Sequence, residues 1–144
     1  GLMMTTHVSD VMSHQFTPVA QTLNINGVRE KLLTAPHGEL FVVDENSALL
    51  GTITLEDLSD SAFDHSIDDV VNASDVARLH PPSLSANDSL EAALKMMQDT
   101  GEEHVAVVED RTSMKLIGFL HEIDVMLIYN RALIDARREE RGEM

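Results

Sequence analysis

Hydrophobic and polar positions follow the same order twice along this chain. Short apolar runs at residues 40–43 and 105–108 predict buried strands, because they are rich in β-branched residues and bounded by polar ones. After each run come a polar turn and a second apolar run, at residues 49–53 and 116–120. Ahead of each pair, apolar residues recur at helical spacing, at positions 25, 28, 32 and 33 and again at 90, 93, 94 and 97. The pattern predicts two α/β units of the same build.

The segments around these units carry capping and breaking signals. Ser9 and Ser74 are each predicted to cap a short helical turn ahead of a unit. Pro18 favours an extended chain at residues 16–19, because the residue before proline avoids helical angles. The segment 35–38 ends the first long helix, and Thr100-Gly101 ends the second. Asp88 and Glu91 suggest a capping box for the second helix, and a short helix is expected from Leu55 toward Phe63.

The last helix is predicted to be the longest. From Glu122 onward, apolar residues at positions 125, 128, 129, 132, 133 and 136 form one face of a helix. Mixed charges follow at residues 137–141. This face either packs on the core of the same chain or forms a seam with a second subunit, and the sequence favours neither.

The two halves also share a motif. Residues 51–57 (GTITLED) reappear with changes at residues 118–124 (GFLHEID), each behind an apolar strand that ends in Val-Val. This order resembles a tandem CBS pair, or Bateman module, whose mark is a strand ending in Val-Val-Asp and then Gly-hydrophobic-hydrophobic-Thr-x-x-Asp. The resemblance implies an α/β (α+β) fold of two β-α-β-β-α repeats related by pseudo-two-fold symmetry, with a long C-terminal helix. The expected boundaries are 7–66 for repeat 1, 67–130 for repeat 2, and 131–144 for the helix extension and charged tail.

Composition excludes several classes of function. Ten basic against 25 acidic residues give a net charge of −15, which argues against nucleic acid as a partner. No cysteine is present, and no P-loop or nucleophile motif is found, so we expect no enzyme activity. The seven histidines show no metal-ligand spacing, so we expect no metal site. No apolar run reaches the roughly 18 residues of a membrane span, and no signal-peptide pattern opens the chain, so we expect a soluble segment.

The Thr54-x-x-Asp57 motif allows two interpretations. It can be a capping box, in which each side chain bonds the backbone amide of the other. It can also be a ligand site, because a helix N-terminus attracts phosphate and a carboxylate can accept from both ribose hydroxyls. The CBS resemblance implies the second, with Asp57 on ribose and Thr54 near phosphate. In the second copy Asp124 keeps the ribose acceptor, while His121 either stacks on the ligand and approaches phosphate or simply fills space and caps the helix.

The resemblance further implies that each cleft is built from both repeats. Residues expected near Asp57 are Pro82, Ser83, Glu102 and Glu103, and those expected near Asp124 are Thr17, Pro18, His37 and Gly38. Glu102 and Glu103 would repel phosphate, so the Asp124 cleft is expected to suit an adenine nucleotide better. AMP, ADP or ATP would act as a regulatory ligand, and no cofactor is required.

Residues 72–76, 101–104 and 121–133 also resemble the cytosolic tail of bacterial ClC-type chloride channels and transporters. That resemblance implies a regulatory module at the cytoplasmic face of a membrane, joined to a transmembrane domain of its parent protein and forming a homodimer. Two alternatives stay open: a ligand-free dimerisation module, or the CBS unit of an enzyme or a cation transporter.

Overall fold

The computed structural model describes residues 1–58, 66 and 68–142. Its helices (α, with η for 3-10) and strands, in chain order, are α1 (Leu2–Thr5), η1 (Val8–Asp10), β1 (Thr17–Ala20), α2 (Ile25–Thr34), η2 (Pro36–Gly38), β2 (Glu39–Val43), β3 (Leu49–Thr54), η3 (Leu55–Leu58), α3 (Ala73–Val76), β4 (Arg78–Leu79), β5 (Ser83–Ser85), α4 (Leu90–Thr100), β6 (His104–Val108), β7 (Leu116–His121) and α5 (Glu122–Glu140). The predicted α/β fold of two like repeats is confirmed.

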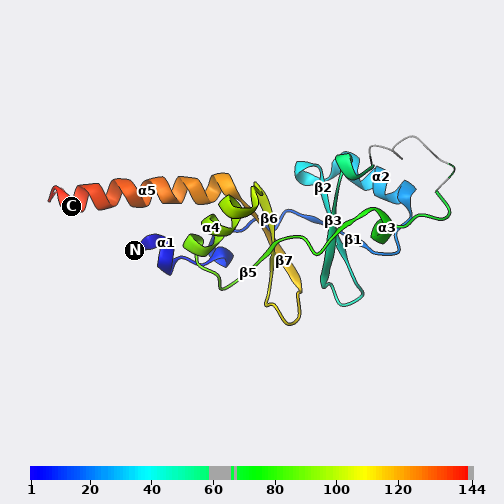
Figure 1. Ribbon diagram of the computed structural model, residues 1–144, viewed down its shortest axis with the longest axis horizontal. Coiled ribbons are helices and arrows are strands. Elements are labelled where there is room, and N and C mark those ends of the chain that lie inside the picture. Colours follow the sequence, from blue (N-terminus) through cyan, green and yellow to red (C-terminus); the bar gives the residue numbers. More distant parts are fainter. Residues whose placement is uncertain (59–65, 67, 143–144) are drawn as a thin grey trace.

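The strands form two sheets with the same connections. In the first sheet β1 runs parallel to β2, β2 antiparallel to β3, and β4 pairs on the far side of β3. The second sheet repeats this order with β5, β6 and β7. Figure 1 shows the sheets in the middle of the molecule, with α2 and α3 at one end and α1, α4 and α5 at the other.

The two sheets pack against each other through alternate residues of their strands. Leu40 and Val42 face the helices of the first repeat, whereas Phe41 between them faces the second sheet, as period-two alternation requires. There the ring of Phe41 meets that of Phe119 edge-on at 5.1 Å, with each residue 1% exposed. This shared core contains Phe41, Leu49, Ala106, Val108, Leu116 and Phe119. It joins the repeats into one body.

Each repeat also contributes its leading segment to the other one. Val8 is fully buried in the core of the second repeat, and its backbone N–H donates to the Asp88 carbonyl (2.8 Å). Ala73 is fully buried in the core of the first repeat and donates to the Leu23 carbonyl (2.7 Å). The two halves therefore clasp one another.

The first glycine of each motif makes room for these crossing segments. A Cβ on Gly51 would lie 2.8 Å from the Arg78 carbonyl oxygen, and one on Gly118 would lie 2.4 Å from Sδ of Met12 and 3.2 Å from the Ser13 carbonyl oxygen. Because real Cβ atoms do not approach other atoms within 3.0 Å, a side chain at position 51 would push the backbone of the crossing segment away from the sheet, whereas one at position 118 would mainly displace the flexible side chain of Met12.

Three predicted caps are wrong. The N-cap of η1 is His7 rather than Ser9, with the Asp10 carboxylate accepting from the His7 N–H (3.1 Å). The N-cap of α3 is Asn72 rather than Ser74, in a capping box with Asp75. Several residue types accept well at an N-cap, so a nearby serine was not decisive.

The third wrong cap is the one predicted at Asp88 for the second long helix, α4. The N-cap of α4 is Ser89, whose Oγ accepts from the Ala92 N–H (3.1 Å). Asp88 instead accepts from the Ser85 N–H (2.9 Å) and pairs with Arg111 (2.8 Å). The predicted helix from Leu55 toward Phe63 is described only as η3, and its remainder lies outside the described residues.

The helix α5 leaves the body of the molecule (Figure 1). Its first turns pack on α4 and α1, and Val125 is fully buried. Further along, Leu133 is 38% and Ile134 50% exposed. Of the two open interpretations, packing on the same chain therefore holds for the beginning of this helix, and a seam with a second subunit stays a prediction. No helix among the described residues has the length and apolar character needed to cross a membrane.

Candidate functional site

The first motif lies where β3 passes into η3, at the end of the strands of the first sheet. Thr54 ends β3 and pairs with Glu39, the first residue of β2. The Asp57 carboxylate accepts from the Thr54 backbone N–H (2.8 Å) and hydroxyl (3.2 Å). This is one half of the capping box that the sequence suggested, and it fixes the carboxylate beside the strand end.

Both repeats line the cleft beside this motif. The cavity has a volume of about 520 Å³ and is lined by Glu39, Thr52, Thr54, Glu56, Asp57, Arg78, Gly101, Glu102, Glu103 and His104. The expected approach of Asp57 to Glu102 and Glu103 is therefore observed. Pro82 and Ser83, also expected here, are not among the described residues that line the cleft.

The charge of this cleft is strongly negative. Five carboxylates face Arg78, which pairs with Glu102 at 3.3 Å. Burial raises the pKa of Glu39 to about 7; Arg78 opposes this increase, whereas Glu102 and Asp57 add to it. Near neutral pH a fraction of Glu39 is therefore protonated and can donate a hydrogen bond inside the cleft.

The second motif has different chemistry at the same place. His104 begins β6 and stands directly opposite His121, the last residue of β7. Directly opposed residues project from the same face of a sheet, and their ring centroids are 5.1 Å apart. The backbone N–H of Glu122 donates to the Glu103 carbonyl (2.8 Å), which ties the start of α5 to the residue before His104.

His37 of the first repeat completes this group. It lies in η2 with φ 57° and ψ 16°, a left-handed conformation that costs a non-glycine residue roughly 1–2 kcal/mol. Its ring centroid is 4.3 Å from that of His121 and 5.3 Å from that of His104. Burial, and then the neighbouring His37, lower the pKa of both His104 and His121.

These observations change the interpretation of His121. It is the N-cap residue of α5, as one of the two interpretations expected, but its side chain makes no capping hydrogen bond to the helix. Its lowered pKa also favours the neutral imidazole, which gives it less attraction for phosphate than a protonated ring. The cavity at the start of α5 has a volume of about 200 Å³ and is lined by Glu103, His104, His121, Glu122, Ile123 and Met126.

Only part of the expected Asp124 cleft is assembled. The ring of His37, which was expected beside Asp124, lies against that of His121, and the described residues that line the small cavity include neither Asp124 nor Thr17 and Pro18. Thr17 and Pro18 instead pair with β2 as part of β1. This small cavity has less than half the volume of the Asp57 cleft and so offers a nucleotide less room, whereas the expectation that the Asp124 cleft suits a nucleotide better stays a prediction.

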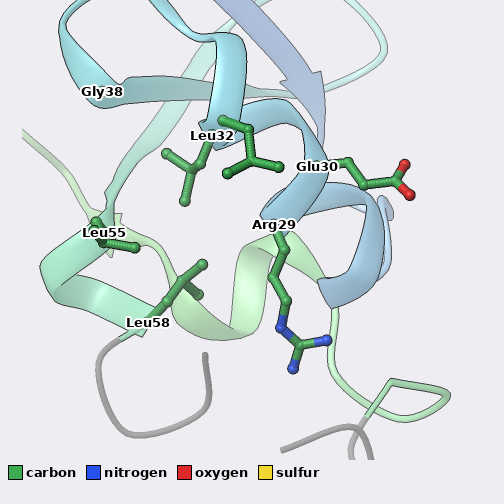
Figure 2. Close-up of a pocket in the computed structure, with 7 residues that line it drawn as sticks. Arg29, Glu30, Leu32, Gly38, Leu55 and Leu58 are labelled. Atoms are coloured by element: carbon green, nitrogen blue, oxygen red, sulfur yellow. The ribbon is translucent and has the colours of Figure 1, made fainter. Parts of the chain in front are cut away.

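Gly38 lies in a separate groove (Figure 2). This groove has a volume of about 410 Å³ between α2 and η3 and is lined by Arg29, Glu30, Leu32, Leu33, Gly38, Leu55 and Leu58. In Figure 2 the leucine side chains lie around the hollow, and the carboxylate of Glu30 points away from it. Apart from Arg29 and Glu30 its lining consists of leucines and one glycine, which suits an apolar group better than a nucleotide.

Sequence reasoning missed Glu39, Arg78 and His104 as residues of the site. The register of the hairpins could have found two of them, because Glu39 and His104 each stand opposite the fourth residue of a motif. Arg78 enters by a different route. It belongs to β4, which crosses to the first sheet from the second half of the chain.

Solved structures with the same fold include proteins with bound ligands. The cytosolic domain of the magnesium channel MgtE, in complex with ATP, has a TM-score of 0.69 and 18% identity; the match covers 85% of this chain and 48% of that one. CBSX2 in complex with AMP has a TM-score of 0.66 and 24% identity over 92% and 98% of the two chains. Hypoxic Response Protein I, with two coordinated zinc ions, has a TM-score of 0.66 and 19% identity over 84% and 97%. At these identities the likeness shows the fold alone.

The chain spans about half the length of the magnesium-channel domain and nearly all of the other two proteins. None of the curated proteins matches it in sequence. The CBS domain family is matched twice, over residues 8–63 and 73–131, which together make up most of the chain. With its two clasped repeats and a cleft built from both, this chain belongs to the CBS domain family as a tandem pair.

Proposed function

We propose that this CBS pair is a non-catalytic regulatory module that binds an adenine nucleotide in the cleft beside Asp57. The observation that carries the proposal is the junction of the Thr54-x-x-Asp57 motif with Glu102 and Glu103 of the other repeat in one cavity. Its volume of about 520 Å³ falls in the range typical of small-molecule sites. Structural neighbours that hold ATP and AMP support this ligand class.

Each group in the cleft has a role in this proposal. Asp57 accepts from the two ribose hydroxyls with the oxygen that Thr54 leaves free, and such charge-assisted bonds are strong. Arg78 is the cation nearest to a bound phosphate, and its side chain is 54% exposed. The protonated fraction of Glu39 donates to a polar atom of the ligand.

Charge decides which nucleotide binds best. Each added phosphate brings negative charge toward the five carboxylates of the cleft, and this repulsion is only partly screened at such short range. We therefore expect AMP to bind more tightly than ADP, and ADP more tightly than ATP, in the absence of a divalent cation.

Ligand binding would regulate through the relative placement of the two repeats. A ligand that contacts both repeats favours the relative arrangement of the repeats in which all its contacts are made. It shifts the equilibrium between two such arrangements only by the difference between its affinities for them. The continuous chain from β7 into α5 would carry the change to the exposed end of α5 and to a homodimer partner.

The parent protein in this proposal is a ClC-type chloride channel or transporter, with the module at the cytoplasmic face of the membrane. The support is the resemblance of residues 72–76, 101–104 and 121–133 to such tails. The coding sequence upstream of residue 1 tests it: membrane-spanning segments are expected there, and a parent without them would remove the channel assignment.

Isothermal calorimetry with AMP, ADP and ATP tests the ligand. We expect one bound AMP per chain, with affinity decreasing as phosphates are added. If millimolar AMP gives neither heat nor a change in Tm, the sensing function is wrong and the pair serves only to join or dimerise its parent protein.

A further inference from the structure

Three histidines from the two repeats meet at the edge of the inter-repeat interface. His37 comes from the turn before β2 in the first repeat, and His104 and His121 come from paired strand ends in the second. Each offers one imidazole nitrogen, and these three nitrogens all lie within 4.8 Å of one another. His37 is exposed and the other two are half-buried, so an ion could reach the group from solvent.

The spacing is close to that of a bound metal ion. Imidazole nitrogens lie about 2.0–2.1 Å from zinc, and in a tetrahedral site they are therefore roughly 3.3 Å apart. The nitrogens must therefore approach one another by at most about 1.5 Å, which is within reach of side-chain rotation, particularly at the exposed His37. Strand pairing and the Glu122–Glu103 backbone bond hold the main chain of His104 and His121 in place, so only their side chains need to rotate.

The surroundings favour a cation and the neutral form of the ligands. Glu102 and Glu103 adjoin His104 in the sequence and line the neighbouring cleft. Burial lowers the pKa of His104 and His121, and neutral imidazole is the form that binds metals. The ring centroid of Phe119 lies 4.8 Å from that of His121 and 5.4 Å from that of His104, so the phenyl ring limits the movement of both imidazoles on one side.

The donor set identifies the class of metal. Magnesium and calcium prefer oxygen ligands, whereas three imidazoles suit zinc and other late first-row divalent ions. Three protein ligands leave one tetrahedral position for water or for a carboxylate. The left-handed conformation of His37 places its ring at the group at an energetic cost, which a bound ion would offset.

We propose that His37, His104 and His121 form a binding site for a divalent transition-metal ion, with zinc as the reference ion, that links the two repeats. The bound ion would cross-link η2 of the first repeat to the β6–β7 strand ends of the second. It would thereby stabilise the clasped arrangement in proportion to its concentration. This site shares His104 with the lining of the Asp57 cleft, but His37 and His121 lie outside that lining, and metal binding does not require a bound nucleotide.

The test is zinc titration of the chelator-treated full chain by calorimetry, in excess magnesium to occupy surface carboxylates. Wild type should bind one zinc per chain and show an increased Tm. The variants His37→Asn, His104→Gln and His121→Thr should each bind at least about 100-fold more weakly, since each removes one of three ligands. Asparagine tolerates the left-handed conformation of position 37, so the His37→Asn chain should fold.

His14→Gln is the matched control, because His14 is also exposed but lies outside the group. It should bind zinc like wild type. Cobalt gives a second measurement: wild type should show the visible bands of tetrahedral Co²⁺, and His37→Asn should lose them. Absence of zinc binding, displacement of zinc by magnesium, or equal binding by His37→Asn and wild type would each overturn the proposal.

Discussion

Glu39 and His104 occupy the same position in the two repeats. Each begins the first strand of a hairpin and pairs with the last residue of the returning strand, which is Thr54 in one copy and His121 in the other. The backbone is therefore alike at the two sites, whereas the side chains are a carboxylate with a hydroxyl in one and two imidazoles in the other. This asymmetry supports different ligands for the two copies of one motif.

The Asp57 carboxylate should matter more for nucleotide binding than that of Asp124. Asp57→Asn keeps an oxygen for the Thr54 N–H but loses the charge that would hold two ribose hydroxyls. We expect AMP affinity to fall about tenfold or more, measured by calorimetry. Asp124→Asn is the matched control at the equivalent position and should change affinity by less than about threefold. Equal losses in both variants would show that the clefts are assigned wrongly.

Removing one cleft carboxylate should strengthen nucleotide binding. Glu102→Gln lowers the repulsion of phosphate and releases Arg78 from its ion pair. We expect AMP to bind about two- to fivefold more tightly and ATP to gain more than AMP, with both gains reduced at high salt. Glu109→Gln, which removes a carboxylate outside this cleft, should leave affinity unchanged. No gain in Glu102→Gln would argue that phosphate lies elsewhere.

Glu39 should make the protein less stable as pH increases. Its pKa is raised from 4.5 to about 7 in the folded chain by burial, with Glu102 and Asp57 adding to the increase and Arg78 opposing it. Between these values the folded state holds a proton that the unfolded state has released, so the free energy of unfolding decreases from pH 4.5 to 7 and then levels off.

The Glu39→Gln variant checks this dependence. Relative to wild type, its free energy of unfolding should be unchanged below pH 4.5 and about 1–2 kcal/mol higher at pH 8. This gain is smaller than the full pKa shift would give, because solvent screens the partly exposed carboxyl group. Urea unfolding in the presence of a chelator measures the difference. A gain that is the same at all pH values would contradict the expected pKa.

The motif glycines should differ in their tolerance of a side chain. Gly51→Ala would place Cβ against a backbone oxygen of Arg78, which cannot rotate away, so we expect a loss of about 2–3 kcal/mol. Gly118→Ala would press mainly on the flexible side chain of Met12, and we expect a loss of about 1–2 kcal/mol. Chemical denaturation measures both. The reverse order would show that the crossing segments are not held as described.

The sequence predicted the repeat architecture well because the hydrophobic pattern directly reflects burial. The apolar runs at 40–43 and 105–108 contain no polar residue. In the first of them Leu40 and Val42 face the helices, while Phe41 faces the other sheet. Both faces of these strands are covered, which removes the usual alternation with polar residues. Caps were less predictable, because Ser, Asn, Asp and His near a helix start all compete for the same amide groups.

The histidine group could not be found from spacing. His104 and His121 meet through strand register, and His37 joins them only because the two repeats pack face to face. Metal-ligand patterns read along a chain detect ligands on one helix or one loop, not ligands from two repeats. Likewise, Arg78 reaches the Asp57 cleft because β4 crosses to the first sheet.

The most direct test of the inter-repeat nucleotide site is an NMR titration of the labelled chain with AMP. The account predicts that the amide signals of Thr54 and Asp57 in one repeat, and of Gly101 and Glu102 in the other, shift together along one binding curve. No shifts at millimolar AMP, or shifts confined to a single repeat, would contradict it.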